Sequence, residues 1–426
     1  MSANTHRTDD GAAGRKASPG SPHPAIVLLL LSAAYIAITL NILGFVGMMP
    51  LVQAEFTISG AQAGLYTSFY FMSATVIAIF AGRIVDRVGT RQGLVIGTTT
   101  VGVMMLLHAI SPLYFVILLL AFVTGIGFSL ITPSVSKGVM ENVSGRRRAG
   151  AMGVAHGIGG SGALFGTALM PYFGQLYGWR TVLVVGGAVA LLVSLIILHV
   201  YRRVAVAEPD HRATKTTGSG RSSSLKQDLK ELLKNKPLLV TCLIGSVFGI
   251  ALSSITSHMA LFLHQDLEYS PALAGVGVSA FHLGGVFGQP SWGVINDKLL
   301  GGRRHLGLLL LASFSAALVF LVAGVATGGA LGLGAMLAIS LALGFCVMGM
   351  PSLFLTTISE LSPAEHTGIA TGIAVIFIRV GVVVAAPVFG LMSDLTGDYT
   401  ASWYTLGTVV VVISLIVTVL MRRYRM

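Results

Sequence analysis

Long apolar runs separated by short polar segments dominate the chain. An α-helix needs about 20 mostly apolar residues to cross a bilayer, and most of these runs reach that length. The pattern predicts an all-α membrane protein with twelve transmembrane helices in two six-helix bundles. The predicted spans are 25–48, 61–81, 94–110, 112–136, 150–171, 179–201, 237–264, 271–293, 305–325, 331–355, 368–392 and 401–421.

The composition agrees with a chain surrounded by lipid. Of the 426 residues, 54% are hydrophobic and only 10% are charged, whereas a soluble domain averages about 25% charged residues. The net charge of +11 is scattered over separate polar segments. It therefore indicates contact with anionic membrane lipids and not nucleic-acid binding. Cys242 and Cys346 each lie in an apolar run, which predicts buried thiols and no metal site.

The basic residues orient the predicted spans. If both chain ends lie on the same side of the membrane, nearly all of the 27 Lys and Arg residues lie in segments on that side. The two exceptions are Arg180 and Arg379. Lys and Arg are retained on the cytoplasmic side of membrane proteins. We therefore expect a multi-pass protein of the cell (inner or plasma) membrane with both termini in the cytoplasm.

The same pattern divides the chain into five segments. We expect a disordered cytoplasmic tail at 1–24, an N-terminal six-helix bundle at 25–201, a cytoplasmic linker at 202–236, a C-terminal bundle at 237–421 and a tail at 422–426. In the linker, leucines recur at helical spacing opposite a face of lysines, which predicts an amphipathic helix in the inner interface. A partner-binding helix is the alternative.

Two stretches of sequence recur about half a chain apart. Gly82 and Asp86 in the first copy are each followed 211 positions later by Gly293 and Asp297. A second match pairs Pro171-Tyr172-Phe173-Gly174 with Pro387-Val388-Phe389-Gly390. The repeats indicate two similar bundles that can move against each other. The charged element consists of Gly82, Asp86, Arg87, Gly89 and Arg91, and of Gly293, Asp297, Lys298 and Arg303.

Six plus six spans, a long central loop and a Gly-x-x-x-Asp-Arg-x-Gly-x-Arg element after the second span resemble the major facilitator superfamily. The resemblance covers residues 25–421, and the second copy of the element is the looser match, with Lys298 in place of arginine. It implies transport by alternating access. It also implies that both charged elements form a cytoplasmic gate, in which Asp86 and the nearby arginines latch one state. The alternative is a static charge cluster that only fixes topology.

Polar residues inside the spans point to the substrate. Arg379 lies near the middle of the eleventh span and His282 near the middle of the eighth. A guanidinium at that depth costs about 2.5–3.5 kcal/mol on insertion scales, so it should face water or an anion. The resemblance implies that both spans line a central cavity. The candidate substrate-binding residues are Arg379, His282, His156, Ser253, Tyr35, Asn41 and Tyr70.

A buried arginine without a buried acid predicts a small anionic substrate, held by a bidentate contact to carboxylate or phosphate. The structural alternative is that Arg379 bonds helix carbonyls. We expect a secondary transporter of a small organic anion, functional as a monomer, with no cofactor and with a coupling proton left open. Proton-driven efflux of drugs or metabolites is the alternative function. The sequence has no nucleophile, Walker or metal-ligand motif, so an enzyme is not expected.

Overall fold

The computed structural model describes residues 23–144, 147–205, 232, 234–328, 332–362 and 366–423. The regular elements among these residues are all helices, joined by turns and short irregular segments. The predicted N-terminal tail and most of the predicted amphipathic linker helix lie outside the described residues, so neither prediction is tested.

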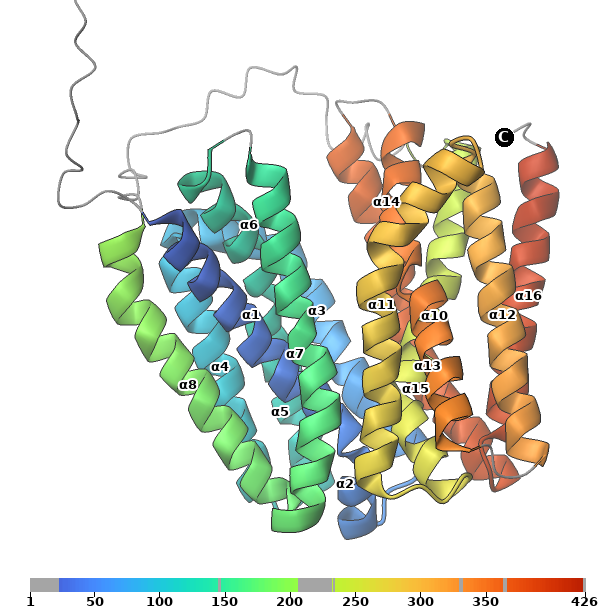
Figure 1. Cartoon of the computed structure of the whole chain (residues 1–426), viewed down its shortest axis with the longest axis horizontal. Helices are drawn as coiled ribbons and strands as arrows, with labels where there is room; N and C mark the ends of the chain where they lie inside the picture. Colours follow the sequence, from blue (N-terminus) through green and yellow to red (C-terminus); the bar gives the residue numbers. More distant parts are fainter. Residues whose placement is uncertain are drawn as a thin grey trace, which may run out of the picture.

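The first half of the chain forms a bundle built around α1 and α7, which pack along each other. Figure 1 shows this half in blue to green, at the left of the view. Its helices are α1 (Pro24–Gly47), α2 (Met49–Phe56), α3 (Gly60–Val88), α4 (Thr90–Ile110), α5 (Tyr114–Ser129), α6 (Ile131–Asn142), α7 (Arg148–Tyr177) and α8 (Trp179–Val204).

The second half of the chain, coloured yellow-green to red in Figure 1, forms the other bundle. In this bundle α10 packs along α15. Its helices are α10 (Lys236–Gln265), α11 (Pro271–Leu299), α12 (Arg304–Gly328), α13 (Leu333–Val347), α14 (Met350–Leu361), α15 (Thr367–Thr396) and α16 (Thr400–Arg423).

Local sequence signals set several helix boundaries. Ser59 and Gln62 form a capping box at the start of α3, and the Ser270 side chain accepts from the backbone of Leu273 at the start of α11. Such caps satisfy backbone N–H groups that have no partner within the helix. Gly89 joins α3 to α4 with φ 87°, a conformation that only glycine adopts readily.

Ten of the described helices, or continuous helix pairs, are long and apolar enough to cross a membrane, and α3 makes eleven if it is counted as one bent span. Twelve spans were expected. The helix α7 has the length but carries eight glycines and His156, which lower its hydropathy. The structure thus supports ten or eleven of the twelve expected spans by this criterion.

The two halves meet unevenly. We define the terminal face as the face where α1 begins and α16 ends, at the top of Figure 1, and the opposite face as the one that holds α2. The halves contact each other mainly through α3 with α15 and through α7 with α11. The closest of these contacts involve the ends of the helices nearest the opposite face, as described below.

Candidate functional site

A cavity of about 770 Å³ lies between the two halves. It takes its walls from α1, α3, α5 and α7 on one side and from α10 and α11 on the other. From α7 it takes residues between Gly153 and Ala163, and from α11 residues between His282 and Pro290. These segments lie in the middle of their helices and toward the terminal face, so the cavity extends from the centre of the protein toward that face.

Arg379 lies on α15 next to this cavity, although it is not among the described residues that line it. Its guanidinium carbon is 4.9 Å from the centre of the Phe71 ring, and it interacts electrostatically with Tyr35 and Tyr70. All three aromatic residues line the cavity. Within the described chain, the guanidinium has no carboxylate at ion-pair distance. A cation–π contact contributes about 0.5–2 kcal/mol, which is less than the cost of a mid-membrane arginine, about 2.5–3.5 kcal/mol.

Among the predicted residues, Tyr35, Tyr70, His156 and His282 line the cavity. The rings of Tyr35 and His156 lie edge to face at 5.7 Å, so the first half contributes a continuous polar and aromatic wall beside Arg379. His282 is only 4% exposed, and its Nε2 atom has no hydrogen-bond partner among the described residues. A buried polar atom without a partner is costly, which suits a group that contacts a ligand or water.

The other two predicted residues are bound within the fold. Ser253 lines the cavity, but its hydroxyl donates to the carbonyl of Val382 at 2.7 Å. Asn41 does not line the cavity: its amide donates to the carbonyls of Ala37 and Gly186 at 2.8 and 3.0 Å. Asn41 therefore holds α1 against α8 and does not face the ligand site in this conformation.

Asp394 joins the two halves at the opposite face. Its carboxylate accepts from the backbone N–H groups of Gly60 at 2.6 Å and Ala61 at 2.9 Å, the first two residues of α3. His258 on α10 hydrogen-bonds the Gly60 carbonyl at 3.1 Å. The N-terminus of a helix carries partial positive charge and unpaired N–H groups, so a carboxylate there is stabilising. Gly60 is thus held at both its N–H and its carbonyl by the second half.

A proline in α15 makes a second contact between the halves possible, closer to the centre of the protein than Asp394. Pro387 lies inside α15 and has no N–H, so the carbonyl of Val383 loses its helical partner. Ser68 of α3 donates to that carbonyl at 2.5 Å. The freed carbonyl of Val383 therefore accepts a hydrogen bond that joins the two halves. Beside it, a Cβ atom on Gly64 would lie 2.5 Å from the Ala386 carbonyl, so the two backbones touch directly.

The helices α7 and α11 close the other side of the same face. Ser279 donates to the carbonyl of Leu164 at 2.9 Å, and a Cβ atom on Gly275 would lie 2.4 Å from the Thr167 carbonyl. Thr167 lies four residues before Pro171, so this carbonyl also lacks its helical partner. The cavity is therefore sealed toward the opposite face by two strips of close backbone packing.

The family model for the Major Facilitator Superfamily matches residues 29–377 and, in a second match, 247–426. The chain belongs to the major facilitator superfamily. It is therefore a multi-pass membrane transporter and not an enzyme, which confirms those two expectations.

Two relatives within the superfamily are similar to the chain at low sequence identity. The chain is 22% identical to a probable sulfoacetate transporter, SauU of Cupriavidus necator, over 82% of this chain and 83% of that protein. It is 20% identical to the quinolone resistance protein NorA of Staphylococcus aureus, over 57% of this chain and 58% of NorA. The match thus spans little more than half of NorA.

Solved structures share the fold. A bacterial homologue of the human lysosomal transporter Spinster, in an inward-facing and unoccupied conformation, superposes with a TM-score of 0.71. It is 18% identical, and the alignment covers 93% of this chain and 96% of that one. The nucleoside transporter NupG gives a TM-score of 0.75 at 14% identity, covering 93% and 100% of the two chains.

The first copy of the superfamily's charged element forms contacts within its own half. Asp86 pairs with Lys137 of α6 at 3.5 Å, and Glu141 lies 3.9 Å from the same ammonium group. Arg91 donates through Nε to the Leu198 carbonyl of α8 at 3.1 Å. Arg87 is exposed, and no described atom lies within 4 Å of a Cβ placed on Gly82. The cation that meets Asp86 is therefore Lys137, which the sequence analysis had not assigned to the gate.

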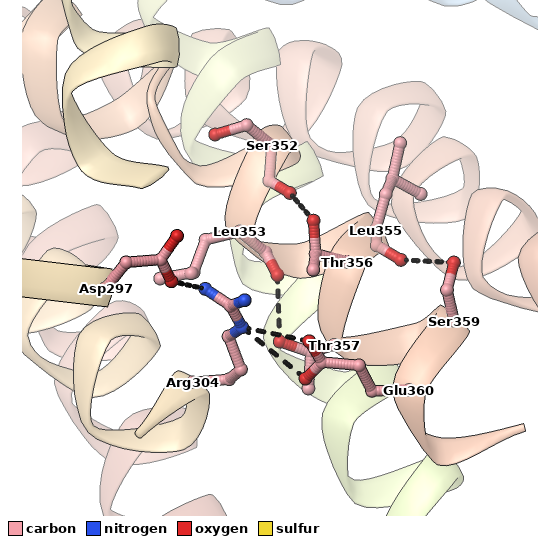
Figure 2. A network of polar contacts seen from close by, with 9 residues as sticks. All are labelled: Asp297, Arg304, Ser352, Leu353, Leu355, Thr356, Thr357, Ser359 and Glu360. Atoms are coloured by element: carbon pink, nitrogen blue, oxygen red, sulfur yellow. Dashed lines mark hydrogen bonds and ion pairs between the residues drawn. The ribbon is translucent and has the colours of Figure 1, made fainter. Parts of the chain in front are cut away.

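The second copy repeats this arrangement with a different cation. Figure 2 shows Arg304 of α12 between Asp297 of α11 and Glu360 of α14. The guanidinium lies 2.5 Å from Asp297 and 3.2 Å from Glu360. The exposed residues Lys298 and Arg303 take no part in these ion pairs, and a Cβ on Gly293 would meet no described atom within 4 Å. Each half thus holds one acid–cation–acid cluster at the terminal face.

Acidic groups at the opposite face lie in contrasting environments. Burial tends to raise the pKa of Glu55, but hydrogen bonds from Arg180 and Trp179 outweigh it and lower that pKa below its usual range. For Asp266, burial raises the pKa to about 6; a hydrogen bond from the Tyr399 N–H acts against the shift, and nearby Asp398 adds to it. Asp266 directly follows the end of α10, and burial is the main cause of its raised pKa.

The lining residues that the sequence analysis missed include Phe71, Thr256 and Gln289. Thr256 is 6% exposed, and its hydroxyl has no partner among the described residues. A threonine in an apolar run gives no signal of its own, because most such hydroxyls bond the preceding helical turn. The Thr241 hydroxyl does so, donating to the Pro237 carbonyl at 3.0 Å.

Proposed function

We propose that this protein is a secondary active transporter that moves a small organic anion across the membrane by alternating access. The observation that carries the proposal is Arg379, a mid-span guanidinium beside a central cavity with no carboxylate partner in the described chain. A carboxylate or phosphate would supply the missing counter-charge in a bidentate contact. The likeness to a probable sulfoacetate transporter supports an anionic substrate.

We further propose that the terminal face is cytoplasmic in the plasma membrane, as the basic residues favour. The present conformation is then inward-facing, with its closure on the outer side. The two charged clusters act as the inner gate in the other state, when Gly82 and Gly293 meet the facing half. Their open surroundings in this conformation support that role. One chain encloses the whole cavity, which supports a monomeric transporter.

Proton-driven efflux of drugs or metabolites is the second candidate. The partial likeness to NorA favours it. The described residues that line the cavity include His156 and His282 but no Asp or Glu. A cationic drug would find no counter-charge there, so this candidate fits neutral or anionic compounds better.

Transport by reconstituted protein tests the proposal. Purified protein in liposomes should exchange labelled carboxylates or sulfonates across the bilayer, and Arg379→Gln should reduce the rate at least ~10-fold through loss of the charged contact. Arg379→Lys should retain part of the activity because it keeps the charge. Arg202→Gln is the matched control, since Arg202 lies exposed at the end of α8, away from the cavity.

Two outcomes would contradict the proposal. Uptake of cationic dyes that Arg379→Gln leaves unchanged would favour the efflux alternative. Anion exchange at the same rate in wild type and Arg379→Gln would remove Arg379 from the site. Imposing a proton gradient in the same liposomes shows whether transport is coupled to protons.

A further inference from the structure

One fixed positive charge lies next to the cavity. The described lining itself includes no Lys, Arg, Asp or Glu, and the guanidinium carbon of Arg379 lies 4.9 Å from the ring centre of the lining residue Phe71. Neither His156 nor His282 forms an ion pair with a described carboxylate. A first anionic group on a ligand can therefore be neutralised, whereas a second one would stay unpaired in a largely apolar space, which is costly.

Aromatic side chains surround that charge. The Phe71 ring lies under the guanidinium, the Tyr70 ring is 4.6 Å from Phe71, and the Phe128 ring is 5.3 Å from Tyr70. All three rings line the cavity. An anion held by Arg379 therefore has an aromatic surface directly beside it, on which an apolar body can be buried.

The remaining polar groups of the cavity are neutral. On the second half, the Thr256 hydroxyl and the His282 Nε2 atom are buried without partners in the described chain. They can hydrogen-bond a ligand or bound water, but they provide no charge to pair with another anion. The cavity volume of about 770 Å³ falls in the range of sites for drug-sized ligands, roughly 300–1,000 Å³.

We infer that the substrate is an amphipathic monoanion, in which a single carboxylate or sulfonate is attached to a ring-sized apolar body. The inference rests on the proposed function and narrows it. It separates this chain from a carrier of small dianions such as sulfoacetate. The same cavity would reject a second acidic group at the far end of the apolar body.

Calorimetric titration of the full chain in lipid nanodiscs tests this inference with a matched set of probes: acetate, benzoate, naphthoate, naphthalenedicarboxylate and sulfoacetate. We expect affinity to rise from acetate to benzoate to naphthoate as more apolar surface is buried. The dicarboxylate and sulfoacetate should bind at least ~10-fold more weakly than naphthoate. Arg379→Gln should abolish naphthoate binding, and Phe71→Leu should weaken it while leaving the preference for one charge.

The possible outcomes distinguish failure of the monoanion inference from failure of the proposed transport of anions. If the dicarboxylate or sulfoacetate binds as tightly as naphthoate and depends on Arg379, the monoanion inference is wrong and anion transport stands. If acetate binds as tightly as naphthoate, the inference that the substrate carries an apolar body is wrong. If no probe shows binding that depends on Arg379, the proposed function fails as well. Arg202→Gln again serves as the control for protein quality.

Discussion

Replacing Asp394 by asparagine should open the opposite face. The substitution keeps one acceptor oxygen near the Gly60 N–H but removes the charge and the second acceptor, which now receives from Ala61 at 2.9 Å. A hydrogen bond to a charged group contributes about 1.5–3 kcal/mol, so the closed state should lose about 2 kcal/mol. That loss shifts the ratio of closed to open protein roughly 30-fold.

Cysteine labelling measures this shift. Cys242 and Cys346 are replaced by alanine and a single cysteine is placed at Ser279, which contacts Leu164 in the α7–α11 strip. This site is sealed in the present conformation and lies on a different strip from Asp394. It therefore reports opening of the whole face and not fraying at one helix end. A membrane-impermeant maleimide added from the opposite face should react roughly 30-fold faster in Asp394→Asn.

The matched control is Asp398→Asn. It removes the same charge from the same face, but the Asp398 carboxylate accepts from the nearby Thr400 backbone and does not join the halves. Its labelling rate should equal that of the parent protein. Equal rates for Asp394→Asn and the parent would refute the role of Asp394 as a clasp between the halves.

Two further predictions concern the same face. Because the pKa of Asp266 is raised to about 6 from 3.8, the charged carboxylate destabilises the fold, and stability from this group is lost as pH rises from about 4 to 6. Asp266→Asn should therefore raise the melting temperature at pH 7.5 and leave it nearly unchanged at pH 4; since the group is partly exposed, the gain is about 1 kcal/mol or less. An equal gain at both pH values would contradict the assignment. Gly64→Val would place Cβ about where the Ala386 carbonyl approaches to 2.5 Å; it should increase maleimide labelling at Ser279, and an unchanged rate would show that the backbones can separate locally.

Much of the architecture could be predicted because it depends on short stretches of sequence. Runs of about 20 apolar residues indicate helices without knowledge of their partners, and the repeat of Gly82 at Gly293 indicated two similar halves. Arg379 and His282 were singled out because charged and polar side chains are costly and rare at bilayer depth. The count of twelve spans was less secure, since glycine in α7 serves packing and also lowers hydropathy.

The contacts between distant helices could not be predicted in this way. Asp394 follows the predicted eleventh span, and its neighbours in sequence do not indicate its partner Gly60, which lies 334 positions earlier. Lys137 directly follows the predicted fourth span, and it pairs with Asp86 on another helix. Both pairings depend on the relative height and rotation of two helices, which packing decides and no single segment encodes.

The position of Pro387 has a mechanical consequence for transport. The carbonyl it frees, on Val383, lies one helical turn from Arg379, a distance of about 6 Å at 1.5 Å per residue. Under the proposed function, a ligand bound by Arg379 acts on the same turn of α15 that Ser68 contacts. Ligand binding and closure of the opposite face would then involve one short segment of α15. Mutations along this turn should change ligand affinity and turnover together, and the protein without ligand should rarely open at the opposite face.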